Sequence, residues 1–246
     1  MALGFLGYVL SKAQASRTVD RWFWRLPYGP RRLLFHACRL DDGITRQQAS
    51  EILGRKALFF HVPKTAGQSV QHSLFGGIVV GHWTFRQFEL AFSKRELASL
   101  FKFTFVRNPW DRLVSAWVFL RGGGRNQWDR EWSEKNLTQF PDFESFVLQR
   151  ISREQVEHEY WHFLPQVHFL RNGRGRVELD FVGRFENLQR DFERLAGLLG
   201  CSVALGSHNR TRSRQSSEYR QFYTPRTAEI VAAAYREDIR TFGYEF

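Results

Sequence analysis

The sequence predicts an α/β domain in which helices flank a central parallel β-sheet. Residues 57–62 (ALFFHV) and 101–106 (FKFTFV) are apolar runs of strand length. Each run leads through a break into a segment with helical periodicity, and a third candidate strand lies at residues 180–182. Strands that alternate with helices along a chain pair in parallel, and the connecting helices then cover both faces of the sheet.

Capping residues predict where the helices begin. Ser93 and Glu96 have the spacing of a capping box, which opens a helix to residue 100. Asn108 before Pro109 predicts the start of a helix that extends to residue 121. A last helix is expected from Thr224 to about residue 240. Further helices are expected at residues 45–53, 68–75, 142–149 and 186–199, and a long loop at residues 122–140.

The length of the chain and its few cysteines limit the possible domain organisation and the cellular compartment. The 246 residues suit a single domain at residues 55–246, preceded by a helical or irregular extension at residues 1–54. The two cysteines, Cys38 and Cys201, exclude a disulfide framework, and whether they pair stays open. So few cysteines favour a reducing compartment, and we expect a cytoplasmic protein of bacterial type. The alternative is the Golgi lumen, if the chain is a trimmed membrane-anchored enzyme.

The N-terminal segment is apolar but short. Residues 3–10 are too few to cross a bilayer, and no basic leader precedes them, so the sequence does not favour a secretory signal. The aromatic residues 22–24 lie among arginines and could anchor the segment at a membrane interface. A helix packed on the domain surface is the favoured interpretation.

The chain is strongly basic. Its 36 Lys and Arg against 25 Asp and Glu give a formal net charge of +11. Such a surface attracts anions, which include nucleotides, nucleic acids, acidic glycans and anionic lipids, and the charge alone does not choose among them.

The first chemical motif follows the first predicted strand. It consists of Pro63, Lys64, Thr65, Ala66, Gly67, Gln68 and Ser69. A strand that feeds a tight loop and then a helix aims backbone N–H groups and the helix dipole at one spot, where an anion binds. Lys64 adds a full charge, and Thr65 and Ser69 add hydroxyl donors. It is not a Walker A loop, because Lys64 precedes Gly67. The alternative is an ordinary turn with a solvated lysine.

The second motif follows the second predicted strand. Arg107 comes at the carboxyl end of that strand, the edge where open α/β sheets bind their ligands. We therefore expect Arg107 beside Lys64, where it could hold a second phosphate together with Ser115. The alternative is that Arg107 and Arg112 pair with carboxylates such as Asp111.

Taken together, the two loops resemble those of the sulfotransferases. Residues 63–69 resemble their 5′-phosphosulfate loop, and Arg107-Asn108-Pro109 with Ser115 downstream resembles their 3′-phosphate motif. The resemblance is to the carbohydrate branch, which includes the heparan sulfate 2-O- and chondroitin sulfotransferases and bacterial relatives. It extends through residues 182–188 (VGRFENL) and 235–246. Gln68 departs from the pattern, because many relatives carry Thr or Ser there.

The resemblance implies a P-loop-kinase-like sulfotransferase fold and an enzyme that uses 3′-phosphoadenosine 5′-phosphosulfate (PAPS). The 5′-phosphosulfate would lie on residues 63–69, and the 3′-phosphate on Arg107 and Ser115. Arg212, in a basic loop that closes over the nucleotide in relatives, is a further candidate for the 3′-phosphate. No metal is implied. Lys64 is the expected cation near the oxygen that leaves the sulfur.

His82 is the predicted catalytic base. Histidine titrates near neutral pH, and Gly81-His82 matches a short element that carries a base in related carbohydrate sulfotransferases. The alternative is a histidine that packs beside Trp83. His61 lies inside a predicted strand and is expected to be structural. Lower-ranked candidates are His158, His162 and His168.

The predicted acceptor is a hydroxyl group, with carbohydrate first and a lipid-linked or small-molecule alcohol next. Tryptophans at positions 110, 117, 128 and 132 lie near arginines that could bind an acidic glycan; alternatively, they are core and loop anchors. Nucleic acid is not an expected partner, and the oligomeric state is left open. Two rival functions remain: a nucleotide-dependent kinase with a related phosphate loop, and a non-catalytic basic module for glycan or nucleic acid. The second does not explain two anion loops after two core strands.

Overall fold

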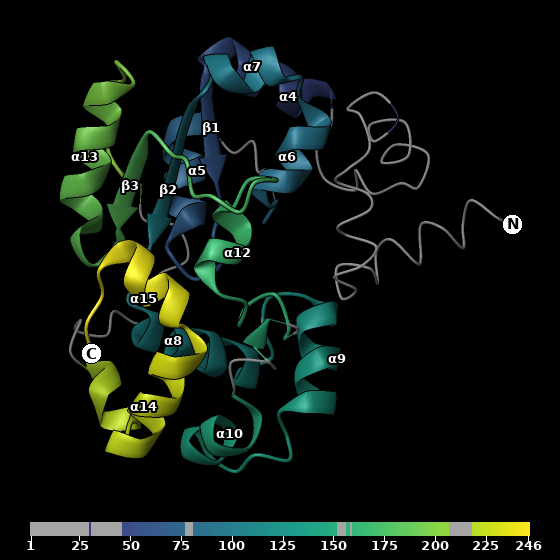
Figure 1. The fold of residues 1–246 in the computed structure, drawn as a ribbon, viewed down its shortest axis with the longest axis vertical. Coiled ribbons are helices and arrows are strands. Elements are labelled where there is room, and N and C mark those ends of the chain that lie inside the picture. Colours follow the sequence, from purple (N-terminus) through teal and green to yellow (C-terminus); the bar gives the residue numbers. More distant parts are fainter. Residues whose placement is uncertain (1–29, 31–45, 77–80, 152–155, 158, 207–217) are drawn as a thin grey trace, which may run out of the picture. The chain divides into compact units, whose positions relative to one another are not determined.

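The computed structural model describes residues 30, 46–76, 81–151, 156–157, 159–206 and 218–246 (Figure 1). Some sequence predictions fall on other residues: the extension up to residue 45 with Cys38, His158, and the loop with Arg212. Their outcome lies outside the described residues. Among the described helices, none combines the length and apolarity that crossing a membrane requires.

A three-stranded parallel sheet confirms the predicted α/β class (Figure 1). Its strands are β1 (Ala57–Phe60), β2 (Phe101–Val106) and β3 (Phe181–Arg184), in the order β1-β2-β3. All of β1 and the last four residues of β2 are buried, as expected for parallel strands that helices cover.

Two compact units emerge from the pattern of contacts along the chain. The first comprises Met1–His61, Ile78–Phe103 and Phe169–Phe181, and the second comprises Val62–Gly77, Thr104–His168 and Val182–Phe246. The division passes through β2 and β3. Because the predicted domain at residues 55–246 includes segments of both units, that boundary stays a prediction.

The first unit has a core rich in phenylalanine. Phe60 stacks on Phe85 and meets Phe88 edge-on, with ring centroids 4.8 and 5.2 Å apart. Its helices are α4 (Arg46–Arg55), α6 (Phe85–Ala91) and α7 (Lys94–Ser99). The capping box of Ser93 and Glu96 opens α7 as predicted. Helix α6 was not predicted, although Thr84 and Gln87 form a capping box at its start.

The second unit carries most of the helices. They are α5 (Gly67–Phe75), α8 (Pro109–Arg121), α9 (Gln127–Asn136), α10 (Phe143–Arg150), α13 (Leu188–Leu198), α14 (Pro225–Ala234), α15 (Arg236–Phe242) and the 3-10 helices η2 (Phe185–Asn187) and η3 (Glu218–Phe222). Helix α12 (Gln166–Leu170) runs across the boundary of the units.

Two helix predictions in the second unit were wrong. Residues 122–140 hold helix α9 rather than a long loop, because the side chain of Asn126 accepts a hydrogen bond from the Asp129 N–H and so caps a new start. The last helix is two helices that meet at Tyr235, whose hydroxyl is buried and donates to the Phe163 carbonyl. The backbone of Tyr235, with φ of −100° and ψ of 24°, is outside helical geometry, and the chain turns there.

Candidate active site

The loop between β1 and α5 has an unusual backbone. Lys64 and Ala66 both adopt left-handed conformations, with φ of 69° and 63°. The residue between them does not, so the loop alternates in handedness, and such alternation turns successive N–H groups toward one concavity. Left-handed backbone costs side-chain-bearing residues of order 1–3 kcal/mol each, and it clusters at functional sites.

The same loop leaves the start of α5 without a side-chain cap. Ala66 occupies the N-cap position and has no side chain that could accept a hydrogen bond. The Thr65 hydroxyl donates to the Val62 carbonyl at 2.9 Å, and this hydrogen bond stabilises the loop conformation. The first N–H groups of a helix have no partner within the helix, and they carry its partial positive charge. Loop and helix start together suit an anion.

Lys64 lies back against the aromatic face of α8. Its Nζ is 3.9 Å from the centre of the Phe119 ring. Burial and, to a smaller extent, the nearby Arg107 charge lower the pKa of Lys64 to about 8, against the opposing effect of Asp129. The amine therefore carries its charge at pH 7, in an environment that opposes that charge.

Arg107 joins the two predicted loops. Its Nη1 donates to the Lys64 carbonyl at 3.1 Å, and its Nε pairs with Asp111 Oδ2 at 2.8 Å. Its guanidinium also lies over the Phe185 ring, 4.0 Å from the ring centre. Both outcomes considered for Arg107 thus hold: it lies beside the Lys64 loop as expected, and it pairs with Asp111.

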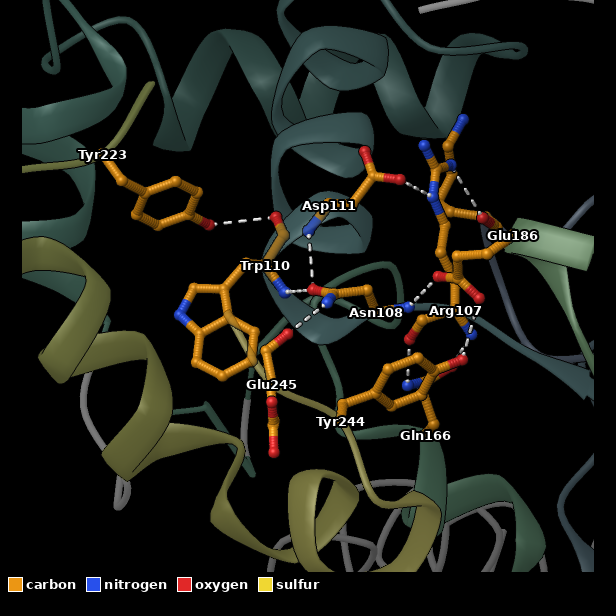
Figure 2. A network of polar contacts seen from close by, with 10 residues as sticks. Arg107, Asn108, Trp110, Asp111, Gln166, Glu186, Tyr223, Tyr244 and Glu245 are labelled. Atoms are coloured by element: carbon orange, nitrogen blue, oxygen red, sulfur yellow. Dashed lines mark hydrogen bonds and ion pairs between the residues drawn. The ribbon is translucent and has the colours of Figure 1, made fainter. Parts of the chain in front are cut away.

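Side chains from distant segments fix the backbone around Arg107 (Figure 2). Gln166 accepts from the Arg107 N–H at 2.9 Å and donates to its carbonyl at 2.8 Å, so both backbone groups are held by one amide. Glu186 accepts from the Asn108 N–H, and Asn108 Nδ2 donates to the Glu245 carbonyl at 2.8 Å. No local sequence pattern predicts the contact of Gln166 with Arg107. Glu186 lies in the segment 182–188 that the resemblance already covered.

Arg112 and Ser115, both on α8 after the second motif, differ in burial and in their contacts. Arg112 is almost wholly buried and donates to the carbonyls of His162 and Leu164, rather than to a carboxylate. It is a structural residue that ties α8 to the segment before α12. Ser115 is half-buried on α8, so its predicted contact with a phosphate stays a prediction.

His82 belongs to the first unit and is hydrogen-bonded there. Its Nδ1 lies 2.8 Å from the His61 carbonyl, and the two imidazole rings have centroids 4.0 Å apart. Because a carbonyl only accepts, Nδ1 carries the proton in the neutral ring and the lone pair is on Nε2. This is the tautomer that a base at Nε2 requires. Its partner His61 stands three residues before Lys64 in the chain.

A buried polar cluster lies next to Lys64 in the second unit. His162 Nε2 is 3.4 Å from Asp129 Oδ1, and Tyr160 donates its hydroxyl to that same oxygen at 2.7 Å. His162 also packs on Phe119, the residue that faces the Lys64 amine. His162 was a low-ranked candidate in the sequence, and Asp129 was not a candidate because it lay in a predicted loop.

The tryptophans are divided between core and surface. Trp110 and Trp117 are buried, and Trp132 stacks on Tyr160 with centroids 4.4 Å apart. Trp128, on α9, is 78% exposed, whereas Trp132 is half-buried. Within the described residues, no group of three or more His, Cys, Asp or Glu side chains could hold a metal ion. The absence of a metal stays a prediction.

Comparison with known proteins decides the family. A family model described as the sulfotransferase family matches residues 78–245, which is more than half of the chain. The chain belongs to the sulfotransferase family. The match confirms the resemblance inferred from the motifs. It begins downstream of residues 63–69, so the role of that loop rests on its own geometry.

The relatives of this sulfotransferase include mammalian proteins. Carbohydrate sulfotransferase 11 of Rattus norvegicus and of Mus musculus are each 24% identical to the chain over 192 residues. The alignment covers 65% of this chain and 51% of each relative, so the chain spans about half the length of the curated relatives it matches. Among solved structures, no significant match exists.

These relatives overturn the predicted location. The expectation of a bacterial-type cytoplasmic protein was wrong, because the curated relatives are mammalian carbohydrate sulfotransferases. The scarcity of cysteine misled the prediction, since a domain with a large core does not need disulfides in an oxidising compartment. Cys201 is a free thiol, and Cys38 lies outside the described residues.

Proposed function

We propose that this sulfotransferase transfers the sulfuryl group of PAPS to a hydroxyl group of a carbohydrate. The observation that carries the proposal is the contact between the two loops of the second unit, made by Arg107 Nη1 and the Lys64 carbonyl. A ligand with two anionic groups can engage both loops at once. PAPS has such groups, in its 5′-phosphosulfate and its 3′-phosphate.

In the proposed reaction, the acceptor oxygen forms a bond to sulfur while the bond between sulfur and the 5′-phosphate oxygen breaks. The other product is adenosine 3′,5′-bisphosphate (PAP), on whose phosphate negative charge develops. The Lys64 ammonium and the N–H groups at the start of α5 would stabilise this charge. Stabilisation of the leaving group and in-line geometry are the main demands of such transfers.

His82 is the proposed base. Its Nδ1 donates to the His61 carbonyl, so Nε2 would take the proton that the acceptor hydroxyl loses. The proposed acceptor is a carbohydrate, because both curated relatives are named carbohydrate sulfotransferases. Exposed Trp128 on α9, with the neighbouring arginines at positions 125 and 130, would suit a sugar ring that carries acidic groups.

Calorimetry with nucleotides, followed by a transfer assay with labelled PAPS on a panel of glycans, tests this proposal. We expect tight PAP binding, weak ADP binding and transfer to at least one glycan. Lys64→Ala is expected to abolish transfer, and Arg107→Ala mainly to weaken PAP binding. His82→Ala is expected to lower turnover by about 100-fold or more while PAP still binds.

The rival functions predict other outcomes. Tighter binding of ADP than of PAP would favour a kinase. Glycan or nucleic-acid binding that is steeply salt-dependent, without any nucleotide binding, would favour a non-catalytic basic module. A fully active His82→Ala protein would remove His82 as the base and leave the rest of the proposal standing.

A further inference from the structure

We propose that the Asp129–His162 pair, anchored by Tyr160, is the electrostatic partner of Lys64 and keeps its ammonium charged for the proposed transfer. Only the role of the Lys64 charge in catalysis rests on the proposed function. The interaction itself is a property of the protein without ligands. Asp129 and His162 would be positioning residues, because they act through Lys64.

The first step of the argument is the path of contacts from Lys64 to the pair. Lys64 Nζ lies 3.9 Å above the centre of the Phe119 ring, and the ring of His162 has its centroid 5.0 Å from that of Phe119. The Nε2 of His162 is then 3.4 Å from Asp129 Oδ1. The ammonium and the His–Asp pair therefore both lie next to the Phe119 ring.

The second step is that Asp129 is built into its place. Asp129 as a whole residue is 1% exposed. One carboxylate oxygen accepts a hydrogen bond from the Tyr160 hydroxyl, and the other accepts one from the Arg125 N–H. The loop before α9 is shaped around it: Gly124 has a φ of +65°, and a Cβ there would overlap the Asp129 side chain. A buried carboxylate with this many arranged donors stays ionised.

The third step is the charge of the pair. Burial raises the pKa of Asp129, but the contacts with His162, the Arg125 N–H and the Tyr160 hydroxyl outweigh it and lower the pKa to about 2. Burial lowers the pKa of His162, and the charges of Lys64 and Arg112 lower it further. The pair thus carries one negative charge at neutral pH. Both ring nitrogens of His162 are buried, and neither makes a hydrogen bond of good geometry; the 3.4 Å approach of Nε2 to Asp129 Oδ1 is an ion-pair distance.

The fourth step is the need of Lys64 for such a partner. Burial and the Arg107 cation both oppose its charge, and Asp129 is the carboxylate that favours it. The carboxylate of Asp111, by contrast, is paired with Arg107. Without Asp129, the amine would lose its proton closer to neutral pH.

The titration of Lys64, followed by the NMR signal of its Cε in ¹³C-lysine-labelled protein, tests the inference. The assignment comes from Lys64→Met. Asp129→Asn is expected to lower the Lys64 midpoint by about one pH unit, as removal of a nearby opposite charge does. Glu131→Gln, which removes an exposed carboxylate from the same helix, is the matched control and is expected to leave the midpoint unchanged.

A charge-conserving variant separates charge from packing. Asp129→Glu is expected to restore the midpoint close to that of the unaltered protein. Equal midpoints in Asp129→Asn and Glu131→Gln would overturn the inference. So would a midpoint in Asp129→Glu that is as low as in Asp129→Asn, because packing rather than charge would then be responsible.

The reciprocal measurement does not depend on the folding of Asp129 variants. Because the Lys64 charge lowers the pKa of His162, Lys64→Met is expected to raise the midpoint of the His162 ring signals. An unchanged midpoint would contradict the partnership. None of these titrations needs PAPS or an acceptor, so failure to bind PAP would refute the proposed function and leave this result intact.

Discussion

At the scale of the residue, Lys64 has a backbone conformation and an environment that are both unfavourable for a charged lysine. Its backbone is left-handed, and its ammonium is buried on Phe119 with the Arg107 cation nearby. Residues that the fold holds in unfavourable conformations and environments are typical of functional sites. The cost of holding Lys64 there should be measurable as stability.

Replacement of Lys64 by methionine should therefore stabilise the protein at pH 7 while it removes the proposed activity. The pKa of Lys64 falls from 10.5 to about 8. Each pKa unit corresponds to about 1.4 kcal/mol of free energy spent on keeping the buried amine charged. Methionine, which has no charge, avoids both the burial of that charge and its repulsion by Arg107. After allowance for solvent near the amine, we expect a gain on the order of 1–2 kcal/mol, or roughly 2–8 °C in the melting temperature.

The sign of the pH dependence distinguishes this cause from better packing. Between the folded and unfolded pKa values, the unfolded chain binds more protons, so the lysine protein gains stability as pH rises from about 8 toward 10.5. The advantage of methionine should thus be full below pH 8 and shrink above it. Urea unfolding at pH 7 and at pH 9.5 measures both values. A gain that is equal at the two pH values would point to packing.

Gly183 shows a different constraint at the same scale. It lies in β3, and a Cβ at this position would overlap the ring of Phe105, a fully buried residue of β2. Gly183→Ala should cost about 1–3 kcal/mol, because an overfilled core must shift. Gly197 in α13 has open space around it, so Gly197→Ala should be neutral or stabilising by up to about 1 kcal/mol. Chemical denaturation compares the two, and equal effects would contradict the clash.

At the scale of the element, the sequence predicted what local chemistry decides. Ser93 with Glu96 and Asn108 with Pro109 open α7 and α8 where expected, since a capping hydrogen bond spans only two or three residues. The same logic would have found α9 at Asn126, but three glycines before it suggested a loop. The contacts of Gln166 and Glu186 with residues 107 and 108 bridge 59 and 78 positions, so no local pattern could reveal them.

The segment that follows α15 supports the loop that carries Arg107 (Figure 2). The Tyr244 hydroxyl donates to Glu186 Oε2 at 3.1 Å, and the other oxygen of Glu186 accepts from the Asn108 N–H. Asn108 in turn donates to the Glu245 carbonyl. Phe246 packs edge-on against Trp110 in the first turn of α8. This segment therefore holds the Arg107 loop by both polar and aromatic contacts.

Tyr244→Phe should weaken PAP binding although Tyr244 is not a predicted ligand contact. Loss of a hydrogen bond to a carboxylate costs roughly 1.5–3 kcal/mol, part of which would appear as a looser Arg107 loop and a PAP dissociation constant about three- to tenfold higher. Tyr235→Phe removes another buried bond, to the Phe163 carbonyl, and serves as the control. It should lower stability and leave PAP affinity unchanged. Calorimetry that shows equal affinity losses in both would indicate general destabilisation.

At the scale of the whole molecule, net charge of +11 acts on every anionic ligand. The sequence could predict the net charge fully, because composition alone sets it, whereas the acceptor depends on side chains that composition does not place. A positive protein raises the local concentration of anions and speeds their encounter, and salt screens the effect over a Debye length of about 8 Å at physiological ionic strength.

The association rate of PAP should therefore depend on salt far more than its dissociation rate. Between about 20 and 500 mM salt, we expect the association rate constant to fall roughly tenfold, because long-range steering is screened. The dissociation rate should change by less, since ion pairs and N–H contacts within the partly buried loops are screened weakly. Stopped-flow fluorescence measures both rates, and uncharged adenosine is the control. If adenosine association slowed as much as that of PAP, salt would be acting on the protein itself. If the PAP association rate stayed constant, the basic surface would have no part in capturing the donor.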